Sequence, residues 1–356
     1  MTKPSTDYLN NKNHTFVIAE AGSNWRTKDL KSSIKRAKKM ISIAAKSGAD
    51  AIKFQTYSSD RVYVPKAGNS NYLTKSGINK SINQIFDEFS MPHHVLGILN
   101  KFCKKQKIRF MSTPFSIDDA KAVNKFVKIH KIASYEINHV PLLKFLASTK
   151  KPIIISTGAA TYEKIDFAIK ILKKHGTKQI CILQCTAAYP APMNSLNIAS
   201  IPRLRDKFKI PVGFSDHSIE PIIAPLLAIG YGATIIEKHF TLNRKFSGPD
   251  HAFALEPSEL EMLVNSVRKA DTAKGTGKKS VEKIEKELKK FATRSIQATM
   301  EIQVGDRLEL DKNIELLRPG KRSRGEDAIK IDKINGKVSR RRIHRGDGIK
   351  SSYVSN

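Results

Sequence analysis

The sequence predicts an α/β fold, a (β/α)8 TIM barrel followed by a small separate domain. Eight short apolar, β-branched runs recur over the first 240 residues, and segments with helical periodicity lie between them. After residue 270 the pattern changes to short runs broken by turns. Near-continuous apolar strands that alternate with helices are typical of a parallel sheet covered by helices. Eight such units in about 250 residues match a TIM barrel.

The predicted elements follow one another in the order that a barrel requires. The strands are expected at residues 16–20, 51–56, 109–113, 130–134, 152–157, 180–185, 212–217 and 234–240. Helical stripes lie after the first strand and after the fifth, at Leu30, Ile34, Ala37, Met40, Ile41, Ala44 and Ala45, and at Ile165, Ala168, Ile169 and Leu172. A doubly wound open sheet is the alternative, but it usually has fewer strands and a Gly-rich first turn, which residues 16–26 lack.

The C-terminal third predicts a boundary and a second domain. The pair Ser258 and Glu261 has the spacing of a capping box for a helix through about Ala270. Residues 271–290 are polar and charged, which indicates a linker. Residues 291–356 then form a domain of about 65 residues, too small for a large core. The expected organisation is a barrel over 1–270, a linker over 271–290 and a small domain over 291–356.

Bulk composition narrows the class of protein. The formal net charge of +30 would attract nucleic acid, an anionic membrane surface or anionic substrates. The lysines are scattered and no nucleic-acid motif is present, so we expect no nucleic-acid partner, with an anionic partner of another kind left open. The most apolar window, Pro221 to Ala233, is too short to span a bilayer. Three cysteines without metal-knuckle spacing suit a reducing cytoplasm.

Polar side chains gather where the predicted strands end, which is the catalytic face of a TIM barrel. They are Glu20, Lys53, Gln55, Thr113, Lys131, Ser134, Ser156, Thr157, Tyr189, Ser215, His217, Glu237 and His239. A charge inside an apolar strand is unfavourable unless it is paired or binds a ligand. An interior ion pair would explain one such residue. Eight strands that all end this way indicate a functional site instead.

These strand ends form the mouth of the predicted barrel, and the residue types found there suggest which ligands it binds. Two lysines and several hydroxyl groups form a cationic cup suited to a phosphate, or to a phosphate and a carboxylate. His217 and His239 end neighbouring strands, so their imidazoles can approach each other at the rim. Two imidazoles with carboxylate or water partners bind Mn²⁺ or Zn²⁺ well and Mg²⁺ less typically.

Several motifs together resemble the sialic acid synthase family, also called N-acetylneuraminate synthases. They are GADAIKFQTY, FMSTPF, KIASYEI, KPIIISTG, CTAAYPAP, VGFSDHS, IIEKHFTL, GPDH and LLRPG, and they extend from the first strand to the C-terminal domain. The resemblance implies a TIM barrel with a C-terminal antifreeze-like (SAF) domain. It also implies a domain-swapped homodimer in which this domain caps the partner's barrel. The implied reaction condenses phosphoenolpyruvate with an N-acetylmannosamine-type sugar and releases phosphate.

The same resemblance implies roles for individual residues. His217 and His239 would hold a divalent metal, Mn²⁺ or Mg²⁺, that polarises the aldehyde of the sugar. The phosphoenolpyruvate ligands would be Lys53, Thr113, Lys131, Ser134, Ser156 and Ser215. The catalytic carboxyl groups would be Glu136, expected to transfer a proton, with Glu20 and Glu237. The sugar site would be formed by Gln55, Phe115, Tyr189, Asp250 and, from the partner's cap, Arg318.

Two other functions remain open at this stage. One is another phosphoenolpyruvate-dependent aldol-type synthase, of the deoxyoctulosonate or deoxyheptulosonate kind. The other is a non-catalytic protein that binds anionic ligands through its basic tail. Trp25 and Arg26 replace the turn that is common in the family, and Ala187 replaces a residue that is often polar. These departures bear on which sugar is used.

Overall fold

The computed structural model describes residues 9–11, 13–70, 73–74 and 78–355. The chain divides into two compact units, Met1–Gly275 (unit 1) and Thr276–Asn356 (unit 2). No helix in the described ranges has the length and apolar character needed to cross a membrane.

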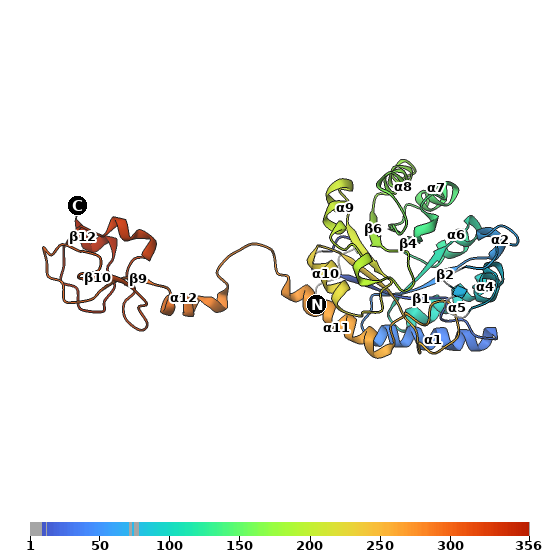
Figure 1. Cartoon of the computed structure of the whole chain (residues 1–356), viewed down its shortest axis with the longest axis horizontal. Helices are drawn as coiled ribbons and strands as arrows, with labels where there is room; N and C mark the ends of the chain where they lie inside the picture. Colours follow the sequence, from blue (N-terminus) through green and yellow to red (C-terminus); the bar gives the residue numbers. More distant parts are fainter. Residues whose placement is uncertain (1–8, 12, 71–72, 75–77, 356) are drawn as a thin grey trace. The chain divides into compact units, whose positions relative to one another are not determined.

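Unit 1 is a (β/α)8 barrel with its strands inside and its helices outside (Figure 1). The strands are β1 (Phe16–Gly22), β2 (Ala51–Thr56), β3 (Arg109–Pro114), β4 (His130–Ile132), β5 (Ile153–Ser156), β6 (Ile180–Cys185), β7 (Val212–Asp216) and β8 (Ile235–His239). All their pairings are parallel, in the order β3-β2-β1-β8-β7-β6-β5-β4. β3 and β4 also lie against each other, which closes the barrel. The TIM-barrel prediction is therefore confirmed.

Ten helices of the described chain accompany these strands in unit 1. They are α1 (Leu30–Lys46), α2 (Ser59–Val62), α4 (Ile82–Phe89), α5 (His93–Lys105), α6 (Ile117–Asn124), α7 (Val140–Ser148), α8 (Tyr162–Lys174), α9 (Ser200–Phe208), α10 (Ile223–Gly230) and α11 (Pro257–Ala273). The predicted stripes of α1 and α8 are mostly buried against the sheet, as Ala37, Met40 and Ala168 illustrate. The interior of the barrel holds a second apolar cluster that includes Ile18 and Met111. This packed interior leaves only the strand ends for chemistry.

Several predicted strand bounds differ from the structure by one or two residues, and three differences bear on the turns and helices. β4 ends at Ile132 rather than at residue 134, because Ser134–Glu136 turns into a three-ten helix, η1. The capping box of α11 is formed by Glu256 and Glu259, whose side chain accepts the Glu256 N–H at 2.8 Å, and not by Ser258 and Glu261. α11 continues to Ala273, three residues into the expected linker.

Unit 2 is built mainly from short strands and turns. It contains α12 (Lys286–Ala292), which begins in the segment expected as a linker and ends two residues beyond it. An antiparallel pair joins β9 (Ser295–Ala298) to β10 (Ile314–Leu317), and a second pair joins β11 (Val338–Ser339) to β12 (Val354–Ser355). Eight buried residues form a small core: Ile296, Ala298, Ile302, Leu308, Ile314, Ile334, Ile343 and Ile349. The unit thus has a core of its own.

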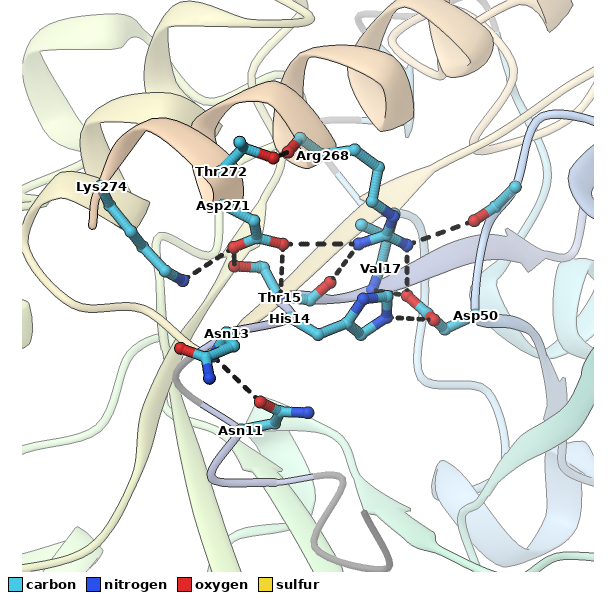
Figure 2. A network of polar contacts seen from close by, with 11 residues as sticks. Asn11, Asn13, His14, Thr15, Val17, Asp50, Arg268, Asp271, Thr272 and Lys274 are labelled. Carbon is cyan, nitrogen blue, oxygen red and sulfur yellow. Dashed lines mark hydrogen bonds and ion pairs between the residues drawn. The ribbon is translucent and has the colours of Figure 1, made fainter. Parts of the chain in front are cut away.

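A polar clamp holds α11 to the face of the barrel opposite the strand ends (Figure 2). Arg268 donates to the Thr15 carbonyl oxygen at 2.6 Å, and its guanidinium lies 2.7 Å from Asp50 Oδ2. Asp271 accepts the Thr15 N–H and hydroxyl, each at 2.7 Å. Because Thr15 precedes β1 and Asp50 precedes β2, the clamp fixes the start of the barrel to its last helix.

The Arg268→Ala protein is expected to lose roughly 2 kcal/mol of unfolding free energy at pH 7, since it removes the hydrogen bond to the Thr15 carbonyl oxygen and the positive charge beside Asp50. Burial opposes the charged form of Asp50, but the His14 hydrogen bond and the Arg268 charge lower its pKa. A lowered pKa contributes stability above the unfolded value, and this contribution is lost as the pH falls. Urea unfolding should therefore show a smaller difference between the two proteins below about pH 4.

The exposed Arg203 on α9 provides a matched control for this measurement. Arg203→Ala removes the same side chain but no contact of the clamp, so its stability should follow that of the parent at both pH values. An Arg268→Ala deficit that stays constant between pH 7 and pH 3.5 would contradict the role of the carboxylates.

Candidate active site

The predicted polar residues of unit 1 lie at one end of the barrel because the strands are parallel and in register. Glu20 of β1 lies opposite Lys53 of β2 on one side and His239 of β8 on the other. Ser215 of β7 lies opposite Glu237 of β8. Adjacent strands thus bring together residues far apart in the sequence, such as Glu20 and His239, which are 219 positions apart.

Two lysines and two glutamates form a buried ionic cluster at the centre of this mouth. Lys53 Nζ lies 2.5 Å from Glu20 Oε2 and 3.8 Å from Glu237 Oε1. Lys131 Nζ lies 3.4 Å from Glu237 Oε1. All four side chains are at most 7% exposed. The interior ion pairs considered as an alternative are therefore present, and they lie at the strand ends.

Hydroxyl groups surround the two lysines. Lys53 Nζ donates to Thr113 Oγ1 at 3.1 Å, and Lys131 Nζ donates to Ser156 Oγ at 2.6 Å. Ser215 Oγ donates to Glu237 Oε1 at 3.3 Å. Contacts with Glu237 and direct hydrogen bonds therefore link five of the six residues that were predicted to bind phosphoenolpyruvate. They are Lys53, Thr113, Lys131, Ser156 and Ser215.

Ser134, the sixth predicted ligand, lies on η1 beside this group. Its hydroxyl oxygen accepts the Gly158 N–H at 3.0 Å. Thr157, also noted at a strand end, is directed differently, because its hydroxyl donates back to the Leu183 carbonyl oxygen at 2.8 Å. Thr157 therefore supports the backbone, whereas Ser134 lies on the turn that carries Glu136.

Burial and neighbouring charges set the protonation of the cluster. Burial raises the pKa of Glu20 to about 7, against the opposing charge of Lys53. Burial also opposes ionisation of Glu237, but Lys131 and Lys53 together lower its pKa. The pKa of Lys131 is lowered by burial, whereas Glu20 and Glu237 outweigh burial at Lys53 and raise its pKa. Near neutral pH, Glu20 is thus the member of the cluster that exchanges a proton.

A second carboxyl group with a shifted pKa lies at the edge of the mouth. Glu136 ends η1, and burial raises its pKa to about 7. It has no ion-pair partner among the described residues within 4 Å. A carboxyl group that is half protonated at neutral pH can act as a general acid or a general base.

The two histidines meet as predicted. The His217 and His239 ring centroids are 5.4 Å apart, and Tyr189 lies beside them with its ring centroid 4.4 Å from that of His217. His217 Nδ1 lies 2.8 Å from the Thr186 carbonyl oxygen, which fits an Nδ1–H donor and leaves Nε2 free as a ligand. His239 Nδ1 is buried without a hydrogen-bond partner.

These observations fit a divalent metal held by two imidazoles. Burial and the nearby His217 lower the pKa of His239 well below its usual range, which keeps its ring neutral, as a metal ligand must be. Across the described ranges, no group of three His, Cys, Asp or Glu residues has the arrangement of a complete metal site. The protein would therefore supply two nitrogen ligands, and water or substrate oxygen atoms would supply the others.

The residues predicted to contact a sugar lie on one side of the mouth. Gln55 Nε2 donates to Glu20 Oε1 at 2.9 Å, and Asp250 accepts the Ser23 hydroxyl at 3.0 Å. Gly22 separates them with a φ of +49°, and a Cβ there would lie 2.9 Å from Asp250 Oδ2. A side chain at this position would thus push the two predicted sugar contacts apart.

Two other predicted sugar contacts are placed differently. Phe115 follows β3 and packs edge-on against Tyr57, with the ring centroids 5.5 Å apart. Arg318 belongs to unit 2, where it follows β10 and is exposed. The structure of unit 1 alone therefore contains every predicted site residue except Arg318.

Cys185 lies at the mouth of the barrel but was not among the predicted site residues. Its Sγ lies 3.8 Å from His217 Nδ1 and 3.6 Å from Ser134 Oγ. Burial opposes the thiolate, but His217 and hydrogen bonds lower the pKa of this thiol. The signal was its position as the last residue of a predicted strand, the same criterion that selected Thr157.

Gly213 explains how β7 reaches the mouth between its neighbours. A Cβ at this position would lie 2.6 Å from the Ile235 carbonyl oxygen and 2.6 Å from Leu183 Cδ2. Real Cβ atoms do not approach other atoms so closely, so only glycine fits. The tight packing of β6, β7 and β8 at this level places Ser215 and His217 beside Glu237.

Comparison with protein families identifies the chain. A family model described as the NeuB family matches residues 40–279. The chain belongs to the NeuB family. The matched range covers most of the barrel of this NeuB-family chain, including all strands from β2 to β8.

Curated relatives extend the similarity over nearly the whole NeuB-family chain. The spore coat polysaccharide biosynthesis protein SpsE of Bacillus subtilis is 38% identical over 87% of this chain and 85% of its own length. The N,N'-diacetyllegionaminic acid synthase of Campylobacter jejuni is 37% identical over 91% of this chain and 96% of its own length.

A solved structure agrees with this NeuB-family assignment. The N-acetylneuraminic acid synthetase of Leptospira borgpetersenii, in complex with citrate, superposes with a TM-score of 0.67. Its sequence is 32% identical, and the match covers 78% of this chain and 91% of that chain. The family assignment therefore rests on sequence and structure together, and it confirms the resemblance seen in the motifs.

Proposed function

We propose that this chain is a nonulosonic acid synthase that condenses phosphoenolpyruvate with N-acetylmannosamine or a related amino sugar. The observation that carries the proposal is the buried cluster of Lys53, Lys131, Glu20 and Glu237 beside the His217–His239 pair. Two of the relatives reported above are named as synthases of this kind of sugar acid.

The cluster can exchange internal ion pairs for a bound anion. With both glutamates ionised, the two lysines are neutralised and would bind phosphate weakly. The pKa of Glu20 is about 7, so a proton taken up by Glu20 leaves the cluster net positive without further rearrangement. The phosphate and carboxylate of phosphoenolpyruvate would then accept hydrogen bonds from Lys53, Lys131 and the hydroxyls of Ser156 and Ser215.

The proposed reaction forms one carbon–carbon bond and breaks one bond to phosphate. The enol carbon of phosphoenolpyruvate attacks the sugar aldehyde, whose oxygen becomes a hydroxyl group when it gains a proton. Water adds to the resulting cationic carbon and loses a proton, and phosphate then leaves to give the keto acid. Glu136, with a pKa of about 7, has the protonation behaviour needed for proton transfer near the attacked carbon.

The proposed metal ligands are His217 and His239, with Mn²⁺ or Mg²⁺ as the ion. When bound, such an ion supplies Lewis-acid polarisation of the aldehyde. The chain's own residues hold this site in shape: the Thr186 carbonyl fixes the His217 ring, and Phe253 packs against His239 with ring centroids 4.9 Å apart.

One assay tests the proposed function. Phosphate release from phosphoenolpyruvate should be measured with Mn²⁺ over a panel of mannosamine-type sugars, and the product should be identified by mass. We expect release with at least one amino sugar and a product whose mass equals the sum of sugar, phosphoenolpyruvate and water minus phosphoric acid. Release only with arabinose 5-phosphate or erythrose 4-phosphate would favour the other aldol-type synthases. No release with any sugar would favour the non-catalytic alternative.

We further propose that the active form is a homodimer in which Arg318 acts on the partner's barrel. Arg318 is exposed and directly follows β10, so its guanidinium is free to bond a sugar's oxygen atoms. A His217→Ala chain and an Arg318→Ala chain should each be poorly active alone. Their mixed dimers should regain activity, because one of the two sites then pairs an intact barrel with an intact cap.

One outcome of the complementation experiment would contradict the proposed role of Arg318. Co-purified mixed dimers that are no more active than the two parents combined would show that each unit 2 serves its own barrel or takes no part in catalysis. An Arg340→Ala chain is a suitable control partner, since Arg340 is also exposed in unit 2 but lies far along the chain from the LLRPG segment. It should be fully active without complementation.

A further inference from the structure

Unit 2 contains a cavity with a mostly cationic lining. Its volume is about 670 Å³, within the size range of small-molecule sites. Three segments that are separate in the sequence line it: α12, residues 320–324 and Lys350. Five lining residues are lysines or arginines, and Glu287 is the acidic one. The cavity lies wholly within unit 2, and none of the residues assigned to the barrel mouth lines it.

Two arginines of the lining are held by the fold. Arg324 donates to the Thr293 carbonyl oxygen at 2.6 Å and lies 3.4 Å from Asp327. Arg322 donates to the Arg345 carbonyl oxygen at 2.9 Å and lies 3.1 Å from Asp347. Their charges are thus partly neutralised, and their main role is to fix the wall of the cavity.

The three lysines of the lining have no such role. Lys290, Lys321 and Lys350 are exposed, and within the described part of the chain their ammonium groups form no hydrogen bond or ion pair. Each comes from a different segment, yet all three border one cavity. Bringing three ammonium groups to one concave surface is unfavourable in the free protein, and an anion placed among them would relieve this repulsion.

We propose that this cavity binds a small oligophosphate, a ligand with two or more linked phosphate groups. A lysine ammonium acts as a point charge toward phosphate, and three of them spaced around a cavity match several phosphates better than a single carboxylate. Phe291, 47% exposed, provides an apolar wall beside them. The limited size of the cavity and its single aromatic side chain favour a small ligand over a nucleic-acid strand, which is typically bound along a groove with several stacking side chains.

Titration calorimetry on the full-length, metal-free chain tests the proposal, with tripolyphosphate and ATP as probes. We expect saturable binding that Lys321→Glu and Lys350→Glu each weaken by about tenfold or more, because each reversal replaces a charge-assisted bond with repulsion. Lys333→Glu is the matched control: Lys333 is an exposed lysine of unit 2 outside the cavity, and its reversal changes the net charge equally. It should leave the affinity within about twofold.

The two probes separate the possible sources of the ligand. Equal affinities would assign recognition to the phosphate chain, and tighter binding of ATP would assign it to a nucleotide; both support the proposal. No saturable binding would overturn it. An equal loss of affinity in the Lys333→Glu chain would also overturn it, because the binding would then depend only on the overall positive charge of the protein, +30. A short single-stranded RNA should also be tested. If it binds more tightly than tripolyphosphate and the Lys321→Glu and Lys350→Glu chains lose this binding, the cavity is a nucleic-acid site and the oligophosphate proposal is wrong.

Discussion

The His239→Ala protein is expected to lose synthase activity and Mn²⁺ affinity by about tenfold or more. His239 is buried at the end of β8, its Nδ1 has no hydrogen-bond partner, and the neighbouring His217 ring lies 5.4 Å away between centroids. With one imidazole gone, the described residues offer no third side chain to replace it. Activity and Mn²⁺ titration should be measured on the same preparation.

His94→Ala serves as the control for this experiment, because His94 is exposed in the first turn of α5 and is not one of the predicted site residues. It should bind Mn²⁺ like the parent. Thermal unfolding should confirm that both variants fold. If the His239→Ala protein turns over at the parent's rate after chelation, the assignment of these histidines to a metal is wrong.

A second large effect is expected from Lys53→Met and Lys131→Met, each of which should weaken phosphoenolpyruvate saturation by about tenfold or more. Each lysine faces a hydroxyl and a glutamate at the strand ends, so a phosphate can take the place of the glutamate. The KM for phosphoenolpyruvate should rise more than that for the sugar.

These lysines are buried, so removing either one also takes a cationic partner from Glu20 or Glu237, and breaking a buried ion pair by itself costs about 3–5 kcal/mol. Ser156→Ala avoids this problem, because it removes a hydroxyl that contacts Lys131 and no charge. It should raise the same KM by a smaller factor and leave the unfolding midpoint nearly unchanged. Variants that are destabilised but keep an unaltered KM would show that the lysines serve only as internal ion pairs.

The barrel and most of its mouth could be predicted from local patterns. A parallel strand buried on both faces is apolar along its length, so Lys53, Lys131 and Glu237 are conspicuous inside such runs. Once the strands are placed in a barrel, their ends must meet. This is why His217 and His239, 22 residues apart, could be expected side by side before any distance was known.

Features that depend on side-chain direction could not be predicted in this way. Cys185 and Leu183 lie two residues apart on one strand and share a face, so alternation alone does not show that Cys185 approaches His217 while Leu183 fills the barrel interior. The contact between Ser23 and Asp250 joins residues 227 positions apart. The capping box of α11 was misplaced by two residues, because Glu256 is an uncommon N-cap whereas Ser258 is a common one.

Gly213 limits how this protein can diverge over generations. Any base change in the first two positions of a glycine codon adds a side chain or a stop, and the smallest of these, alanine, already places a Cβ 2.6 Å from the Ile235 carbonyl oxygen. The obstacle is backbone, which no second substitution can remove. A lineage that adapts to a new sugar is therefore expected to change residues such as Gln55 or Phe115 around a fixed glycine. A saturation library at the mouth would recover few active clones from position 213.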